Sequence, residues 1–164
     1  MNYSYIVGIC NGLVCIYYSP YIYPLIICNP STRQFQEIRN EVDYNAYETV
    51  KQVSLGFGFH PSTNEYKLIR IVLYSTPIRK YNIRANFYVM STNTWTEIDF
   101  NKLSLLLGEM NESRECDSIV QIAGSPTTTL NGVFHWLAEI VSTDQVVVMS
   151  FDMGNEVFRR IRKP

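Results

Sequence analysis

One short pattern occurs four times in this chain: an apolar run, a polar turn, and a bulky aromatic residue that opens a second extended segment. The four copies occupy residues 25–35, 55–66, 87–95 and 146–158. Their aromatic residues are 31, 29 and 63 residues apart, so the last interval is about twice the others. A fixed period of strand–turn–strand units is typical of radial or stacked β architectures. Such scaffolds display loops, so the pattern favours recognition over catalysis.

Two Asn-Gly pairs add a larger repeat. Asn11-Gly12 and Asn131-Gly132 each precede an apolar run. Both central residues of a type I′ hairpin turn need a positive φ, which Asn and Gly tolerate. Each pair is followed by a copy of the first pattern, and the two units lie 120 residues apart. Both pairs therefore predict tight β-hairpins.

The expected fold class is all-β, with antiparallel sheets in a partial, kelch-like β-propeller. Four strands in about 60 residues predict two to three blades, fewer than the four to eight of a closed propeller. Residues 1–164 are expected to form a single domain that is incomplete at both ends. Residues 66–71 alternate charged and apolar side chains like a half-solvated strand. Residues 101–110 form either one short helix or an apolar loop.

Composition argues against several classes of function. The net charge of −1 predicts no general attraction to nucleic acid or to an anionic membrane. No apolar run is long enough to span a bilayer, and residues 1–5 do not resemble a secretory signal. The four cysteines are expected to be reduced thiols of a cytoplasmic protein, with the nucleus as the alternative. His60 and His135 are isolated in sequence, so no metal ion or other cofactor is expected.

An enzyme is not predicted. A cysteine nucleophile would need one of the thiols at 10, 15, 28 or 116 beside His60 or His135, with a lowered thiol pKa. His135 alternates with Phe134 and Trp136, a pattern that favours a partly buried structural side chain. Gly56 and Gly58 lack the Lys-Ser pair and following helix of a phosphate-binding loop. No catalytic residue is therefore assigned.

Two loops are candidate partner-binding sites. The first places Tyr17, Tyr18, Tyr21 and Tyr23 around a proline-containing turn. Tyrosine buries a large area at low entropic cost and keeps a polar tip, which suits a binding surface. The alternative is that Tyr17 and Tyr23 continue the strands on either side.

The second loop, residues 75–86, carries Arg79, Lys80, Tyr81 and Arg84 without an acidic neighbour. Exposed cations of this kind steer an acidic protein surface or RNA toward a binding site. This cluster of four residues, three of them cations, is too small to predict nucleic-acid binding. The alternative is a solvated hairpin tip without a partner.

Six motifs, in this order, resemble the plant F-box-associated domain, most closely that of the S-locus F-box proteins. They are GICNGLVC (8–15), CNPSTRQF (28–35), GFGF (56–59), NEYKLIRI (64–71), LNGVFHWL (130–137) and SFDM (150–153). The resemblance implies a β-rich module that captures the protein to be ubiquitinated. It also implies a link to pollen S-locus-type recognition. In that family a separate F-box binds the Skp1 adaptor of a cullin-type ubiquitin ligase.

This chain has no F-box helices, so Skp1–cullin binding is expected only through an F-box outside it. It also lacks the Gly-Gly doublet of kelch repeats and the Trp-Asp pair of WD repeats. Two other functions stay open. One is a truncated fragment or decoy without ligase function. The other is a hydrolase or sugar-binding propeller.

Overall fold

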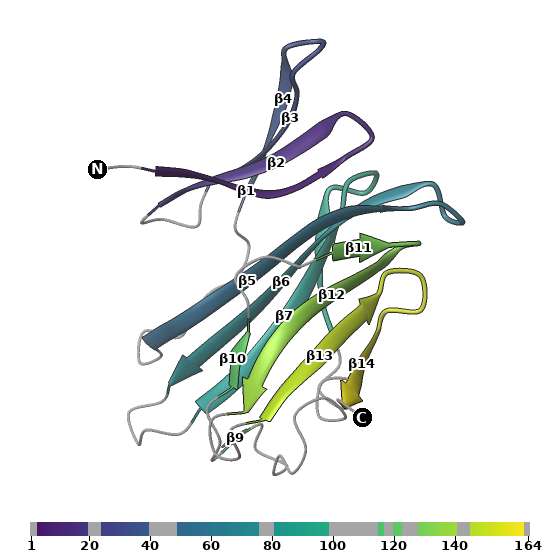
Figure 1. Ribbon diagram of the computed structural model, residues 1–164. Coiled ribbons are helices and arrows are strands. Elements are labelled where there is room, and N and C mark those ends of the chain that lie inside the picture. The colour runs from purple at the N-terminus through teal and green to yellow at the C-terminus, as the bar shows by residue number, and fades with distance from the viewer. Residues whose placement is uncertain are drawn as a thin grey trace.

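The computed structural model describes residues 3–19, 24–39, 49–75, 81–98, 115–116, 120–122, 128–140 and 145–162. Within these ranges the chain forms β-strands and turns but no helix, and the strands build three antiparallel sheets (Figure 1). The predicted all-β fold is confirmed, and three sheets agree with the two to three blades expected. The segment 101–110, considered as a short helix, falls outside the described residues.

The three sheets follow one another along the chain, and each is mainly a meander of neighbouring strands. The first sheet contains β1 (Tyr3–Cys10), β2 (Leu13–Ser19), β3 (Leu25–Asn29) and β4 (Gln34–Ile38). The middle sheet contains β5 (Thr49–His60), β6 (Glu65–Ser75), β7 (Tyr81–Val89) and β8 (Thr94–Glu97), with β9 (Glu115–Cys116) paired to β7. The third contains β10 (Val120–Ile122), β12 (Val133–Ile140), β13 (Gln145–Asp152) and β14 (Val157–Arg162), with β11 (Thr128–Leu130) paired to β12.

Both Asn-Gly pairs form the predicted hairpin turns. Asn11 and Gly12 have φ values of 48° and 79°, and they join β1 to β2. Asn131 and Gly132 have φ values of 49° and 77°, and they join β11 to β12. A positive φ at both central residues defines the type I′ turn, whose twist matches that of the paired strands.

The four copies of the sequence pattern are the hairpins β3–β4, β5–β6, β7–β8 and β13–β14. A four-residue turn joins the strands of each hairpin, and its last residue is left-handed. These residues are Arg33, Asn64, Asn93 and Glu156, with φ between 53° and 58°. In two of the turns the preceding carboxyl or amide oxygen accepts backbone N–H groups: Asn29 Oδ1 accepts from Ser31, and Asp152 Oδ1 accepts from Gly154. This side-chain bond replaces a backbone turn contact.

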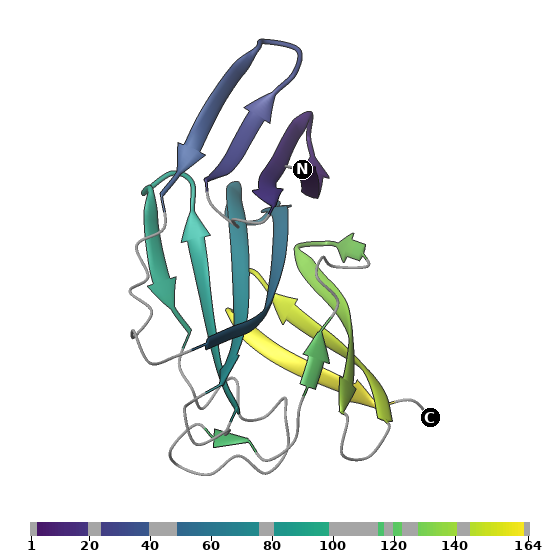
Figure 2. The ribbon, with the colours of Figure 1, turned by 90° about the vertical axis from the view of Figure 1, so that its left-hand side faces the viewer.

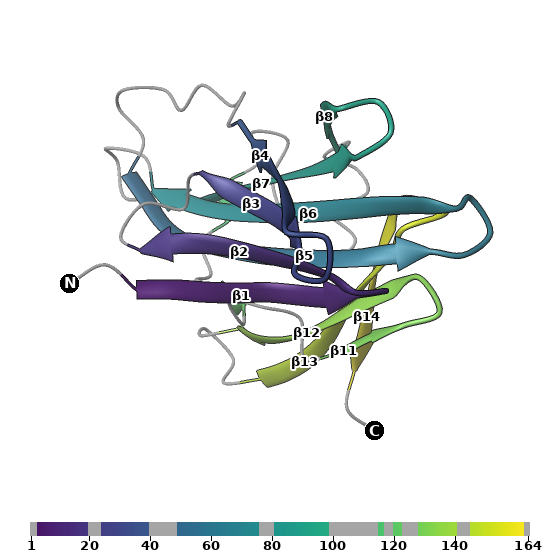
Figure 3. The same cartoon turned by 90° about the horizontal axis from the view of Figure 1, so that it is seen from above.

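The sheets pack face to face, and an apolar cluster fills each junction. Figure 3 looks down onto the first sheet, with the other two beneath it. The first junction buries Val7, Cys15, Leu25, Ile27 and Ile38 against Leu55, Phe57, Leu68 and Tyr88. The second buries Ile69, Ile71, Ile83 and Phe87 against Phe134, Trp136, Met149, Phe151, Met153 and Phe158. The middle sheet is therefore covered on both faces.

Strand β6 corrects the prediction of a half-solvated strand at residues 66–71. Its residues from Lys67 to Tyr74 are all buried, including both cations. Lys67 and Arg70 are three residues apart, so they point to opposite faces of the sheet. Because both faces of β6 carry a neighbouring sheet, one of these two cations lies in each junction.

Arg70 lies in the first junction and is fully buried. Its guanidinium carbon is 4.3 Å from the centre of the Trp95 ring, and Nη2 donates a hydrogen bond of 3.4 Å to Asn86 Oδ1. Burial lowers the pKa of Arg70 to about 10. The guanidinium thus stays charged at neutral pH and is stabilised by the ring face.

Two glycines set the close approach of the sheets. A Cβ atom on Gly8 of β1 would lie 2.8 Å from the backbone oxygen of Phe57 in β5. A Cβ atom on Gly58 would meet only side chains, at 3.1 Å from Phe134 and Thr129 and 3.2 Å from Met153. The first contact leaves less room for adjustment because backbone atoms cannot rotate away.

We expect Gly8→Ala to lower the free energy of unfolding by about 1–3 kcal/mol, and Gly58→Ala to lower it by less. The reason is that the added methyl group at Gly8 forces two backbones apart. Urea denaturation of the purified variants would measure the difference. An equal or larger cost for Gly58→Ala would contradict this account.

Candidate protein-interaction site

The predicted tyrosine loop is only partly described. Tyr17 lies in β2, is half-buried, and stacks on Tyr5 with ring centres 5.2 Å apart. Tyr18 follows it, points to the opposite face of the sheet, and is 40% exposed. Tyr21 and Tyr23 lie outside the described residues. Of the two described tyrosines, Tyr18 is the more available to a partner.

The predicted basic loop is also only partly described. Arg79 and Lys80 lie outside the described residues, and only the backbone of Tyr81 is described, at the start of β7. Arg84 is half-buried, with its guanidinium carbon 5.0 Å from the centre of the Tyr74 ring. The described members of the two loops thus lie in different sheets, the first and the middle one.

A cleft of about 550 Å³ opens between the first sheet and the β7–β8 turn. The β3–β4 hairpin forms one wall and projects beyond the middle sheet (Figure 2). Its apolar lining comes from Leu13, Ile27, Cys28, Phe35 and Met90, and its polar lining from Asn29, Arg33, Gln34 and Gln36. A cavity that combines apolar side chains with a few polar groups is typical of a ligand site. Sequence reasoning missed this cleft because its residues come from three separate segments.

Hydrogen bonds hold the β3–β4 hairpin against the middle sheet. Gln36 Nε2 donates to Asn93 Oδ1 at 3.1 Å and to the Tyr88 hydroxyl at 3.3 Å. The Tyr88 hydroxyl in turn donates to Asn93 Oδ1. Trp95 Nε1 donates to the backbone oxygen of Arg39 at 2.9 Å. These bonds fix one end of the cleft wall, so the cleft is largely pre-formed.

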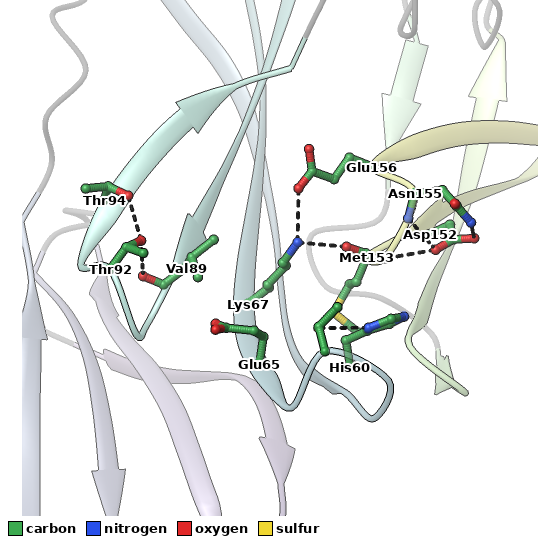
Figure 4. Close-up of polar contacts among 12 residues, drawn as sticks. His60, Glu65, Lys67, Val89, Thr92, Thr94, Asp152, Met153, Asn155 and Glu156 are labelled. Atoms are coloured by element: carbon green, nitrogen blue, oxygen red, sulfur yellow. Dashed lines mark hydrogen bonds and ion pairs between the residues drawn. The ribbon is translucent and has the colours of Figure 1, made fainter.

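The second junction is closed by a charged contact (Figure 4). Lys67 Nζ donates to the backbone oxygen of Met153 at 2.8 Å and lies 3.1 Å from Glu156 Oε1. The ammonium group also lies 5.0 Å from the centre of the Phe87 ring. Lys67 is 7% exposed, so this contact seals the junction where the β13–β14 turn meets the middle sheet.

Tight turns from all three sheets meet around a smaller pocket of about 260 Å³. It is lined by Asn11 of the first sheet, Pro61 of the middle sheet, and Asn131 and Gly132 of the third. His60 packs so closely against Gly132 that a Cβ atom there would overlap its ring. The Asn131–Gly132 turn of the third sheet is thus packed against His60 of the middle sheet.

The outward faces of the first and third sheets carry exposed apolar side chains. On the first sheet these are Ile6, Ile9 and Phe35, and Phe35 is 74% exposed. On the third they are Leu137, Val146 and Ile161. Clustered exposed apolar side chains are typical of surfaces that contact another protein or a membrane.

Hydrogen bonds around Asp152 change its acidity. Burial by itself raises the pKa of Asp152. Hydrogen bonds from the Asn155 side chain and from the backbone N–H groups of Asn155 and Gly154 lower it, and so does the charge of His60. The net effect is a lowered pKa. The carboxylate is thus more stable in the folded turn than in the unfolded chain. Its contribution to stability is present above the unfolded pKa of 3.8 and is lost as the pH falls through the folded value.

We expect Asp152→Asn to lower the free energy of unfolding at neutral pH by less than about 1 kcal/mol, because solvent screens this carboxylate. The difference from the unsubstituted chain should shrink once the pH falls below about 4. Urea titrations at a series of pH values would measure it. A difference that does not change with pH would show that the charge of Asp152 plays no part.

Two of the described thiols, Cys10 and Cys15, are poorly suited to nucleophilic catalysis. Burial, with a smaller effect from the neighbouring Cys28, raises the pKa of Cys15 to about 12. Burial also raises the pKa of Cys10, partly offset by a hydrogen bond with the Phe59 backbone. A catalytic thiol needs the opposite shift. Within the described ranges, no three His, Cys, Asp or Glu side chains gather as metal ligands.

We expect Cys15 to resist iodoacetamide at neutral pH in the folded chain, because it is fully buried and protonated. Cys28, which is half-buried, should be alkylated faster than Cys15. Mass spectrometry of the digested protein would locate the modified residues, with a denatured sample as the control. Alkylation of Cys15 as fast as Cys28 in the folded chain would contradict the burial seen here.

The described residues include no helix that could cross a membrane.

Comparison with known proteins agrees with this architecture. The chain is 39% identical over 168 residues to an F-box protein of Arabidopsis thaliana, covering 97% of this chain and 38% of that protein. It is 23% identical over 163 residues to an F-box/kelch-repeat protein of the same plant, covering 99% of this chain and 40% of that protein. It thus spans about two fifths of the length of these relatives.

No solved structure matches the chain significantly. The family model of the F-box associated beta propeller domain, however, matches residues 2–164. That match agrees with three antiparallel sheets whose neighbouring strands are joined by tight turns. The chain therefore belongs to the F-box associated beta propeller domain family.

Proposed function

We propose that this chain is the substrate-recognition module of an SCF-type ubiquitin ligase receptor and binds the protein to be ubiquitinated. The observation that carries the proposal is the match of the F-box associated beta propeller domain to residues 2–164. Because this domain occupies almost the whole chain, the Skp1–cullin assembly is engaged only through an F-box outside these residues. The module itself makes no covalent bonds, and it works in the cytoplasm or the nucleus.

Features of the surface support a protein as the ligand. The cleft beside the β7–β8 turn has apolar lining, amide groups and one cation, which suits a polypeptide better than a phosphate-rich ligand. Tyr18 and the exposed apolar side chains of the outer faces add area for contact. The chain's charge of −1 gives no broad attraction to nucleic acid. Recognition of the pollen S-locus type belongs to the same proposal.

Proximity labelling in plant cells would test this function. The chain is fused behind an intact F-box and a labelling enzyme, and the F-box with the enzyme alone is the control. We expect specific proteins to be labelled and to gain ubiquitin in a manner that depends on both parts. Labelling no greater than that of the control would refute the function.

The predicted loops are tested in the same fusion. A variant with Tyr18→Ala, Tyr21→Ala, Arg79→Ala and Lys80→Ala should reduce target labelling by about tenfold, because interface residues of this kind carry much of the binding energy. Lys51→Ala, at an exposed position of β5, is the matched control. Equal labelling by the loop variant would exclude these loops while leaving the function intact.

A further inference from the structure

The two inter-sheet junctions have the same plan but different contents. A row of paired residues crosses strands two to four in both the first and the middle sheet. The rows are Val14–Cys28–Phe35 and Leu68–Tyr88–Trp95. Each row ends on the aromatic residue two positions after a left-handed turn residue. Leu13, just before the first row, therefore occupies the position that Lys67 has before the second.

This difference explains why one junction is open. In the closed junction Lys67 reaches the backbone oxygen of Met153, the first residue of the β13–β14 turn, and the carboxylate of Glu156. Met90 is the first residue of the β7–β8 turn and lies in the corresponding place. Leu13 is shorter than lysine and has no donor, so its side chain cannot form the equivalent polar contact with the β7–β8 turn, and a cleft of about 550 Å³ lies between Leu13 and Met90.

The cleft has the chemistry of a peptide-binding site. Leu13, Ile27 and Met90 give it apolar walls, and methionine adapts its shape to different side chains. Asn29 and Gln34 add side-chain amides that match the donors and acceptors of a peptide backbone. The volume lies within the range of ordinary ligand pockets and accepts a large side chain.

Arg33 adds a charge that no contact within the described residues uses. The four equivalent left-handed turn positions hold asparagine twice, and asparagine tolerates this conformation. Glu156 is strained there but forms the ion pair with Lys67. Arg33 has the same strain, lines the cleft, and forms no ion pair or side-chain hydrogen bond with the described residues. Strained backbone positions cluster at ligand-binding sites, so the free charge of Arg33 at the cleft favours a binding role.

We propose that this cleft binds an extended peptide segment of the target protein that carries a bulky apolar side chain next to a carboxylate. The apolar side chain enters between Leu13, Ile27 and Met90, and the carboxylate pairs with Arg33. This rests on the proposed function and names the class of segment recognised. A single cation amid amide groups fits one carboxylate and not a nucleic-acid backbone.

A random dodecapeptide phage library, panned against the whole 164-residue chain, tests the proposal. Enriched peptides are synthesised with a fluorophore, and their dissociation constants are measured by fluorescence polarisation. We expect a consensus with a large apolar residue within two positions of Asp or Glu. Absence of a consensus, or one that is basic, would overturn the proposal.

Two substitutions examine the cleft directly. Leu13→Lys places the closing side chain of the other junction beside Met90 and should weaken peptide binding by about tenfold or more. Arg33→Glu should weaken acidic peptides similarly and should be partly rescued by peptides with Lys in place of the acid. Lys51→Glu, an equally exposed charge reversal in the middle sheet, should leave affinity unchanged. Unchanged affinity in Leu13→Lys would overturn the proposal.

A measurement on the unsubstituted chain covers the case of a variant that does not fold. The methyl resonance of Met90 in a methionine-labelled sample should shift when the peptide is added. Those of Met149 and Met153, buried in the second junction, should not. A Met90 resonance that stays unchanged at saturating peptide would place the binding elsewhere.

The failure of this inference is distinguishable from failure of the proposed function. If the Leu13→Lys fusion labels the same target proteins as the unsubstituted fusion, the cleft is not the recognition site and the receptor function stands. If no fusion labels any protein above the F-box control, the receptor function itself falls.

Discussion

Burial of the middle sheet on both faces is the constraint on which the rest of the structure depends. The first junction needs close contact between backbones, and Gly8 permits it where β1 approaches β5. Double coverage also takes two cations of β6 out of water. Lys67 is satisfied by Met153 and Glu156, and Arg70 by the face of Trp95. Such charges persist in an interior only when their partners are held in place.

The same packing scheme produces two different junctions. Where Lys67 crosses to the next sheet, the interface is sealed. Where Leu13 takes its place, a lined cleft remains under the projecting β3–β4 hairpin. One change of residue type within a repeated scaffold thus separates a closed junction from an open cleft. Repeated β architectures allow such differences, because the scaffold stays constant while individual loops and side chains vary.

The parts of the fold that could be predicted rest on local chemistry. The Asn-Gly pairs required positive φ values, and both form the expected hairpins. Strand β6 shows the limit: its charged and apolar residues predicted a half-solvated strand, yet neighbouring sheets cover both of its faces. Local alternation reports which side a residue faces, and it does not report what lies there. The cleft was not predictable for a similar reason, since Leu13, Ile27 and Met90 meet only after two sheets have packed.

The order of strands and the positions of the turns were determined by the sequence itself, through apolar runs, turn residues and the aromatic residue that follows each turn. The tertiary structure alone decided which cations are buried and which turn meets which sheet. It also decided that Arg33 lines the cleft, whereas the equivalent turn residue Glu156 pairs with Lys67. The physical reason is the separation along the chain over which each interaction acts. Hairpin formation depends on torsion preferences within a few residues, whereas burial and cavity shape depend on surfaces far apart in the chain.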